Sequence, residues 1–120
     1  MPVTVVMAAG GGDFNPIATT VRQSAQHFQL VHALPSLRKA VGVLRRDKPA
    51  LFLMGLDLPD ATSLELIRTV SQELPTRVVV MCRRTNAGAA IEALQAGAAG
   101  YIFTGTDDYD VVRLLKAAAA

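Results

Sequence analysis

Residues 49–60, PALFLMGLDLPD, form the stretch of sequence that decides the fold. Residues 50–54 are an apolar run, and a run of this length is typical of a central strand that is covered on both faces. Residues 57–60 hold two aspartates and Pro59, which indicate a loop. Thr62 or Ser63 can then cap a helix that carries Ile67, Val70 and Leu74. A strand, a loop and a helix are therefore predicted in that order.

The same alternation extends in both directions from this stretch. Further strands are predicted at residues 3–8, 28–33, 78–82 and 101–103, where β-branched and other apolar residues cluster. A segment with apolar residues at helical spacing follows each strand. Five strand–helix units in strict alternation predict an α/β fold, in which helices cover both faces of a parallel five-stranded sheet. Each crossover is expected to be right-handed.

The predicted helices begin at local signals in the sequence. Asn15 is expected to cap the first helix, with Pro16 in its first position. Residues 35–36 are expected to open the second helix and Asn86 to start the fourth, which ends at Gly97, while Thr106 or Asp107 caps the fifth. The apolar residues of the second, fourth and fifth helices are Leu37, Ala40, Val41 and Leu44, then Ala90, Ile91 and Leu94, then Val111, Leu114, Leu115 and Ala118.

Composition excludes several classes of protein. The 120 residues are one domain by size, and 51% hydrophobic with 18% charged residues excludes a disordered chain or a coiled coil. No apolar run reaches the roughly 18 residues of a membrane span, and the N-terminus shows no export signal. Cys82 is the single cysteine, so no internal disulfide forms and a cytoplasmic location is expected. His27, His32 and Cys82 are too few and too scattered for a structural zinc site.

Charge gives no sign of a nucleic-acid-binding surface. The net charge is +2 and aromatic residues make up 5% of the chain, so this domain is not expected to bind nucleic acid directly. The basic residues around the second helix are interpreted as a solvated face. They are Arg38, Lys39, Arg45, Arg46 and Lys48.

In open parallel sheets, ligands bind outside the carboxyl ends of the strands. The candidate positions are therefore residues 8–10, 55–57, 82–84 and 104–105. Three glycines at residues 10–12 match only part of a phosphate-binding loop, because Asn15 stands at the third glycine position of that motif. Cys82 precedes Arg83 and Arg84, which would favour a reactive thiolate, although burial at a strand end is the favoured interpretation.

Two longer stretches carry a resemblance to a known family. Residues 49–60 with 64–68, and residues 93–103 (ALQAGAAGYIF), resemble the third and fifth strand regions of response-regulator receiver domains, the CheY-like fold. The second stretch is most similar to receivers of LuxR/NarL-type transcription factors. The resemblance covers nearly the whole chain and implies a flavodoxin-like three-layer fold with strand order 2-1-3-4-5. It also implies that residues 1–120 are the N-terminal receiver-like domain of a longer regulator.

The chain departs from this family at the expected phosphorylation site. The resemblance places a magnesium-binding acidic pair at residues 8–10, the phosphate-accepting aspartate four residues before Pro59, a Thr or Ser after the fourth strand and a lysine after the fifth. The corresponding degenerate positions are Ala9, Gly10, Gly55, Cys82 and Thr104.

Phosphoryl transfer to a carboxylate needs a nucleophile, a metal ion and balancing cations. The sequence therefore predicts no catalytic residue, no metal and no cofactor, and a chain that is not an enzyme. A relocated site would have to use Asp57 or Asp13, and both are interpreted as ordinary loop aspartates.

The expected function is therefore that of a non-phosphorylatable receiver that acts through protein–protein contact. The resemblance implies a partner face formed by the fourth helix, fifth strand and fifth helix, and a homodimer through that face is the expected assembly. The favoured context is control of an attached DNA-binding output domain. Residues expected on or beside this face are Arg83, Arg84, Tyr101, Asp107, Asp108, Asp110, Arg113 and Lys116.

Two other functions stay open at this point. One is an adaptor or localisation module, such as the atypical receiver on ATPases of pilus-assembly systems. The other is a small-molecule sensor that uses the emptied acidic pocket, with Arg83 or Arg84 binding an anion.

Overall fold

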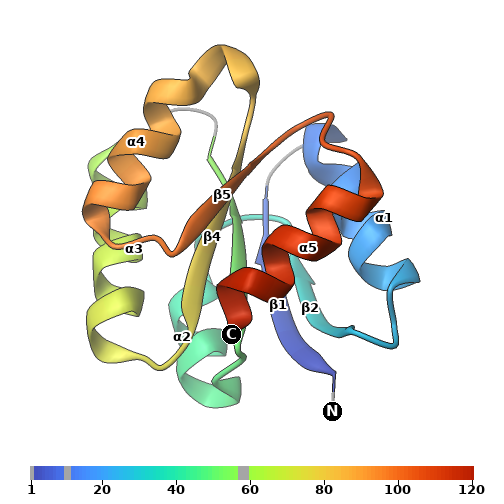
Figure 1. Cartoon of the computed structure of the whole chain (residues 1–120). Helices are drawn as coiled ribbons and strands as arrows, with labels where there is room; N and C mark the ends of the chain where they lie inside the picture. Colours follow the sequence, from blue (N-terminus) through green and yellow to red (C-terminus); the bar gives the residue numbers. More distant parts are fainter. Residues whose placement is uncertain (1, 10–11, 57–59) are drawn as a thin grey trace.

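The computed structural model describes residues 2–9, 12–56 and 60–120. Five parallel strands form one sheet in the order β2-β1-β3-β4-β5, with helices on both faces (Figure 1), so the predicted α/β receiver fold is confirmed. The strands are β1 (Val3–Ala8), β2 (Phe28–Leu34), β3 (Leu51–Gly55), β4 (Arg77–Cys82) and β5 (Gly100–Phe103). The helices are α1 (Asn15–Gln23), α2 (Ala40–Asp47), α3 (Ala61–Glu73), α4 (Ala87–Ala96) and α5 (Asp108–Ala119), with short 3₁₀ turns η1 (Gly12–Phe14) and η2 (Arg84–Asn86).

Strand β3 lies at the centre of the sheet, as its apolar sequence predicts. It pairs with β1, where Leu51 is opposite Val5, and with β4, where Gly55 is opposite Met81. Alternate β3 side chains enter two separate cores. Leu51 belongs to the core under α1 and α5, whereas Phe52 belongs to the core under α2, α3 and α4. Because both faces of β3 are covered, the side chains of residues 51–54 are all apolar and buried.

Three helix starts differ from the sequence prediction. Asn15 is the first residue of α1 rather than its cap, and Phe14 takes the N-cap position without a side-chain hydrogen bond. Helix α2 begins at Ala40, four residues later than predicted, after a bend over residues 35–37. Asp60, rather than Thr62 or Ser63, caps α3, because its Oδ1 accepts the Ser63 backbone N–H at 2.7 Å.

The later helix boundaries agree better with the sequence. Asp107 caps α5, where its carboxylate accepts the backbone N–H of Asp110 at 2.8 Å. Asn86 precedes α4 without a side-chain cap, and Gly97 ends that helix with a φ of 120°. A Cβ at Gly97 would lie 2.3 Å from Ser71 Oγ, so glycine is required there for space as well as for backbone conformation.

Helix α4 is built differently from the other helices. Its buried residues are the small ones, Ala89, Ala90, Ala93 and Ala96. Of the three apolar residues that the sequence pattern singled out, Ala90 alone is buried. The two large residues, Ile91 and Leu94, are 58% and 41% exposed. Alanines allow α4 to pack closely against the sheet and α3, and the bulky side chains then lie on its outer surface.

Candidate functional site

The carboxyl edge of the sheet is where a receiver would carry its phosphorylation site. Here β3 ends at Gly55 and β4 at Cys82, and Ala9 follows β1. Residues 10–11 and 57–59 lie outside the described residues, so the predicted positions Gly10 and Asp57 are not placed. Within the described part of the chain, no group of three His, Cys, Asp or Glu side chains could hold a metal ion.

The space beside Gly55 is filled with hydrocarbon. A Cβ added to Gly55 would lie 2.8 Å from Ala9 Cβ and 2.8 Å from Phe14 Cε2. Non-bonded carbon atoms pack at about 3.5–4.0 Å, so any side chain at residue 55 collides with this arrangement. Phe14 is 2% exposed and belongs to the core under α1 and α5. The ring of Phe14 therefore occupies the space into which an acceptor carboxylate would project.

The position of Phe14 follows from the turn that precedes α1. Phe14 is the last residue of η1 and the N-cap of α1, so the turn delivers its ring inward rather than toward solvent. Its neighbour Asp13 stays exposed and forms an ion pair with Arg83, which follows β4. The buried contact joins the β1–α1 connection to the end of β3, and the surface ion pair joins it to the β4–α4 connection.

Cys82 is fully buried at the end of β4. Burial raises the pKa of its thiol, because the charged thiolate is disfavoured away from water. The favoured interpretation, a buried cysteine at the end of a strand, is therefore confirmed. The backbone N–H of Thr104 donates to the Cys82 carbonyl at 2.9 Å. This hydrogen bond continues the pairing of β4 and β5 at the carboxyl edge of the sheet.

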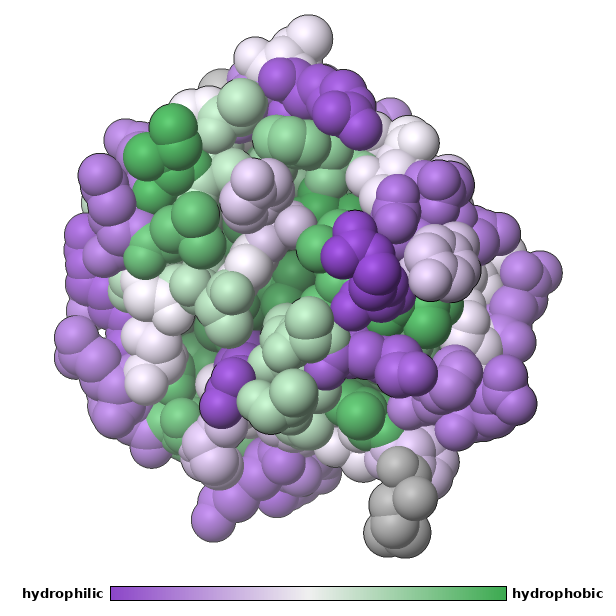
Figure 2. Space-filling model, viewed as in Figure 1, coloured by the Kyte–Doolittle hydropathy of each residue, from purple (hydrophilic) through white to green (hydrophobic). Residues whose placement is uncertain are grey.

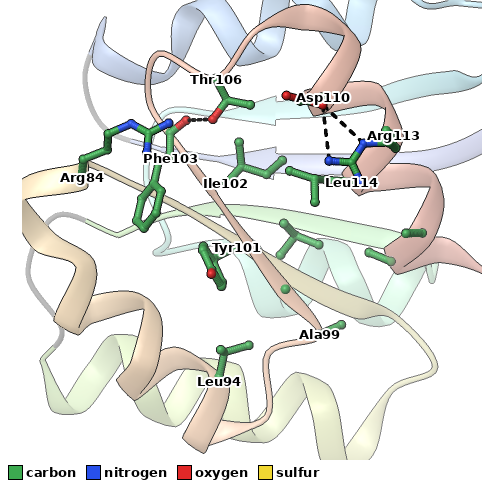
Figure 3. A pocket seen from close by; sticks show the side chains of 14 residues that line it. Arg84, Leu94, Ala99, Tyr101, Ile102, Phe103, Thr106, Asp110, Arg113 and Leu114 are labelled. Atoms are coloured by element: carbon green, nitrogen blue, oxygen red, sulfur yellow. Dashed lines mark hydrogen bonds and ion pairs between the residues drawn. The ribbon is translucent and has the colours of Figure 1, made fainter.

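The α4–β5–α5 face is the second candidate site, and it is hollowed. A groove of about 550 Å³ lies between α4 and α5 with β5 as its floor (Figure 3). Tyr101 and Phe103 lie side by side on β5, with ring centroids 5.2 Å apart. The Arg84 guanidinium lies over the Phe103 ring at 5.2 Å, and Asp110 pairs with Arg113 at 3.3 Å on α5.

The structure separates the residues that were predicted for this face. Tyr101, Arg84, Asp110 and Arg113 line the groove together. Asp107 is used as the α5 cap.

The remaining three predicted residues lie elsewhere. Asp108 accepts a hydrogen bond from Thr20 Oγ1 at 2.7 Å, and so it connects α5 to α1. Lys116 lines a different hollow with His27 and Tyr109, on the α1 side of α5. Arg83 lies at the carboxyl edge of the sheet, paired with Asp13.

Sequence reasoning missed two residues of this face, Ile91 and Leu94. Leu94 lines the groove beside Tyr101, and Ile91 lies one turn earlier on the outer side of α4. Figure 2 shows apolar side chains gathered over α4 and a mixture of hydrophilic and apolar ones over α5. The alanine-rich sequence of α4 is the signal that could have revealed them, since a helix that buries alanines leaves its larger apolar residues outside.

The other groups considered from the sequence have structural partners. Arg45 pairs with Glu73 at 3.1 Å and Arg46 with Asp47 at 2.9 Å, as expected for a solvated helix face. His32 also contacts Asp47, at 2.8 Å. No helix within the described ranges is long and apolar enough to cross a bilayer.

Two curated transcriptional regulators are similar to this chain in sequence. The transcriptional activator ExaE of Pseudomonas putida is 35% identical over 90 residues, covering 68% of this chain and 42% of that protein. A transcriptional regulatory protein of Bacillus subtilis, YhcZ, is 32% identical over 76 residues, covering 62% of this chain and 36% of its own length. The chain thus spans about two fifths of the length of these two relatives.

Solved structures share the fold at lower identity. The receiver domain of the response regulator NarL from Mycobacterium tuberculosis superposes with a TM-score of 0.81 at 22% identity, over 98% of this chain and 96% of that one. A response regulator from Chloroflexus aurantiacus gives 0.83 at 17% identity, over 99% and 98%. The family model for the response regulator receiver domain matches residues 13–116. The resemblance noted in the sequence is therefore confirmed, and the chain belongs to the response regulator receiver domain family.

Proposed function

We propose that this chain is a receiver that works without phosphorylation and signals by protein–protein contact through its α4–β5–α5 face. The observation that carries the proposal is the packing of Phe14 and Ala9 against Gly55, where a methyl group on residue 55 would lie 2.8 Å from a carbon atom of each. A site that holds an aromatic ring in place of a carboxylate has neither the nucleophile nor the room for a phosphoryl group.

The same packing argues against the small-molecule sensor. That function needs the acidic pocket to be vacant, whereas the Phe14 ring fills the space next to Gly55. An anion bound there would lose its hydration to an aromatic hydrocarbon without gaining hydrogen bonds. Arg83 is paired with Asp13 at this edge, so part of its charge is already balanced.

The α4–β5–α5 face supports the contact function. Ile91, Leu94 and Tyr101 are all more than 40% exposed. Leu94 and Tyr101 line the groove, and Ile91 precedes Leu94 by three residues on α4, about one helical turn. Large apolar side chains grouped at a surface are typical of a protein-binding site. Exposing isoleucine and leucine while burying alanine is unfavourable for an isolated domain, because the larger side chains gain more from leaving water. A partner that covers this face would remove the penalty.

The partner in this proposal is a second copy of the chain, and the regulated activity belongs to an attached output domain. The named transcriptional regulators that match are longer than this chain, which is consistent with a receiver joined to a DNA-binding domain. In this proposal the domain itself is not an enzyme, does not bind nucleic acid and resides in the cytoplasm.

The absence of phosphoryl chemistry is tested by intact-mass spectrometry. The protein is incubated with a small phosphodonor and Mg²⁺, beside a phosphorylatable receiver as a positive control. We expect the control to gain one phosphoryl group and this chain to keep its mass. An adduct that is stable in acid and labile in base would overturn the proposal and would identify a carboxylate acceptor elsewhere, with Asp13 and Asp57 as the first candidates.

Self-association is tested by sedimentation equilibrium on Ile91→Ser. We expect a weak dimer for the wild-type chain and a dissociation constant raised on the order of tenfold in the variant, because an apolar anchor is lost. Val31→Ser is the matched control, since Val31 is exposed on β2 at the opposite edge of the sheet. A wild-type chain that stays monomeric at high concentration would remove the dimer, and equal effects of the two substitutions would remove the assignment to this face.

A further inference from the structure

A second groove lies between α2 and α3, on the face of the sheet opposite α1 and α5 (Figure 1). Its volume is about 710 Å³, and it shares no lining residue with the groove over β5. The ion pair between Arg45 and Glu73 joins the last turns of the two helices. The groove lies at the other end, between the bend that precedes α2 and the first turns of both helices, and no ion pair between described residues spans it.

The walls of this α2–α3 groove carry apolar side chains at helical spacing. Leu37 and Val41, four residues apart, form the α2 wall, and Ala61, Leu66 and Thr69 belong to the α3 wall. Leu37, Val41 and Leu66 are half-buried, so part of each side chain stays in contact with water. From Ala61 to Thr69, helix α3 rises about 12 Å, which is the length of about two helical turns.

The shape of the groove suits a helix better than a small molecule. None of the residues that line it is buried, and Arg38, Thr62 and Glu65 are exposed. A small molecule would keep much of its surface in water there, whereas ligand pockets enclose most of the ligand. A helix satisfies its own backbone hydrogen bonds and can pack on side chains alone, whereas an extended peptide needs backbone partners that these walls do not offer.

The free charges at the mouth of the groove are basic. Arg38 lines the groove and Lys39 follows it, and both are exposed. Within the described part of the chain, no carboxylate lies within ion-pair distance of either side chain. Glu65, the acidic residue of the α3 wall, lies 3.6 Å from Arg68, so its charge is partly balanced. The net charge around the groove is therefore positive, which favours an acidic partner.

We propose that the α2–α3 groove binds an acidic amphipathic helix of a partner protein. The apolar stripe of that helix contacts Leu37, Val41 and Leu66, and its carboxylates face Arg38 and Lys39. The groove is separate from the α4–β5–α5 face, so a second copy bound at that face leaves it open. The inference therefore gives the chain a second binding site, for a partner of different chemistry.

A pair of synthetic peptides tests the chemistry of the partner. The acidic peptide has about 16 residues, enough to form a helix, with leucines in an apolar stripe and glutamates beside it. The basic peptide has lysine at each glutamate position. Both carry fluorescein, and fluorescence anisotropy measures their binding to the whole chain. We expect the acidic peptide to bind at least about tenfold more tightly than the basic one, because the rim of the groove is basic.

Charge and apolar variants test the site. Arg38→Glu should raise the Kd of the acidic peptide about tenfold and lower that of the basic peptide. Lys116→Glu is the matched control, because Lys116 lies on α5 and outside this groove, and it should change neither Kd.

Val41→Ser should raise the Kd of the acidic peptide about fivefold, because an apolar contact is lost. Val43→Ser is its matched control, since Val43 is a half-buried valine of the same helix that does not line the groove. Circular dichroism checks that each variant is folded.

Chemical shifts in ¹H–¹⁵N spectra locate the bound peptide. We expect changes at residues 37–41 and 61–69. No binding of the acidic peptide, equal binding of the two peptides, or shift changes confined to the α4–β5–α5 face would overturn the inference. The same residues shifted by decanoate but not by the peptide would replace the helix with a small amphiphilic carboxylate. Weaker self-association of Val41→Ser would instead identify a second copy as the occupant. Both outcomes would overturn the proposed partner, whereas Ile91→Ser and the phosphodonor experiment test the proposed function separately.

Discussion

The ring of Phe14 lies against the Cα of Gly55, and a methyl group at residue 55 would be 2.8 Å from Phe14 Cε2. The two residues are 41 positions apart in the sequence, yet the packing of each depends on the size of the other. A side chain at position 55 would displace the ring, and a smaller residue at position 14 would leave a void beside the glycine. The empty place expected at the carboxyl edge is thus part of the hydrophobic core.

Gly55→Ala should therefore destabilise the chain by about 1–3 kcal/mol, as expected for overpacking in a fixed core. Urea denaturation followed by circular dichroism measures the change. Gly42→Ala in α2 is the matched control, because nothing lies within 4 Å of a Cβ there, and it should stabilise the helix by about 0.5–1 kcal/mol.

The coupling between the two positions can be measured with a double-mutant cycle. Phe14→Ala alone should cost about 3–5 kcal/mol through the cavity that it leaves. In that background the added methyl of Gly55→Ala meets open space on the side of the ring, so its own penalty should shrink. Strict additivity of the two substitutions would contradict the contact.

Lys48 ends α2 in the left-handed backbone region, with φ 44° and ψ 57°. It is the one non-glycine residue with positive φ among those that the structure describes. Because its side chain makes this conformation costly, Lys48→Gly should raise the free energy of unfolding by about 0.5–1 kcal/mol. Thermal and urea denaturation report the change, and a loss of stability on substitution would show that the lysine stem is needed for packing.

The cap of α3 predicts a pH dependence. The Ser63 backbone N–H lowers the pKa of Asp60 below its ordinary value of 3.8, because it donates to the charged carboxylate. A lowered folded-state pKa stabilises the fold above the unfolded pKa, and that stabilisation is lost as pH falls toward the folded value.

Asp60→Asn keeps a capping acceptor and removes the titration, so it isolates this effect. The stability difference between wild type and Asp60→Asn should shrink between neutral pH and about pH 3. Urea midpoints measured over that range check it, and a constant difference would mean that the Asp60 charge is not coupled to folding. Asp47, whose pKa is lowered mainly by its hydrogen bond with Arg46, titrates alike in both proteins and cancels.

Thr20 joins α1 to α5 through its hydrogen bond to Asp108, with the hydroxyl 2.7 Å from Oδ1. Thr20→Val preserves shape and removes the donor, so it should cost about 1–2 kcal/mol in the free energy of unfolding. Asp108→Asn retains an acceptor and serves as the milder control. If Asp108 instead belonged to the dimer contact, Asp108→Asn would weaken association, and sedimentation would show it.

Much of the fold could be predicted because the strands follow simple rules. The five apolar runs appear as five strands within one or two residues of their predicted ends. Helix starts were harder, because several residues near each start can act as a cap. Asp60 precedes Thr62 and Ser63, and its carboxylate reaches the free backbone N–H groups first.

The two features on which the proposed function rests could not be predicted from local patterns in the sequence. The local sequence shows Phe14 only as an aromatic residue near the start of a helix, and its contact with Gly55 on β3 depends on the tertiary fold. Ile91 and Leu94 resemble core residues at helical spacing, and only the close packing of the α4 alanines places them outside. In both cases, contacts between segments distant in sequence decide the outcome, whereas a one-dimensional pattern records only neighbours.

The Asp13–Phe14 turn also constrains how the chain can change over generations. An aspartate introduced at residue 55 would be burdened by the aromatic ring before it could capture any phosphoryl group, and trimming the ring first would leave a hole. Each of these two substitutions destabilises the fold when it occurs alone, so selection for stable folding opposes both. Substitutions at exposed positions do not disturb the packing of Phe14, whereas an acceptor aspartate at residue 55 would need a simultaneous change at residue 14.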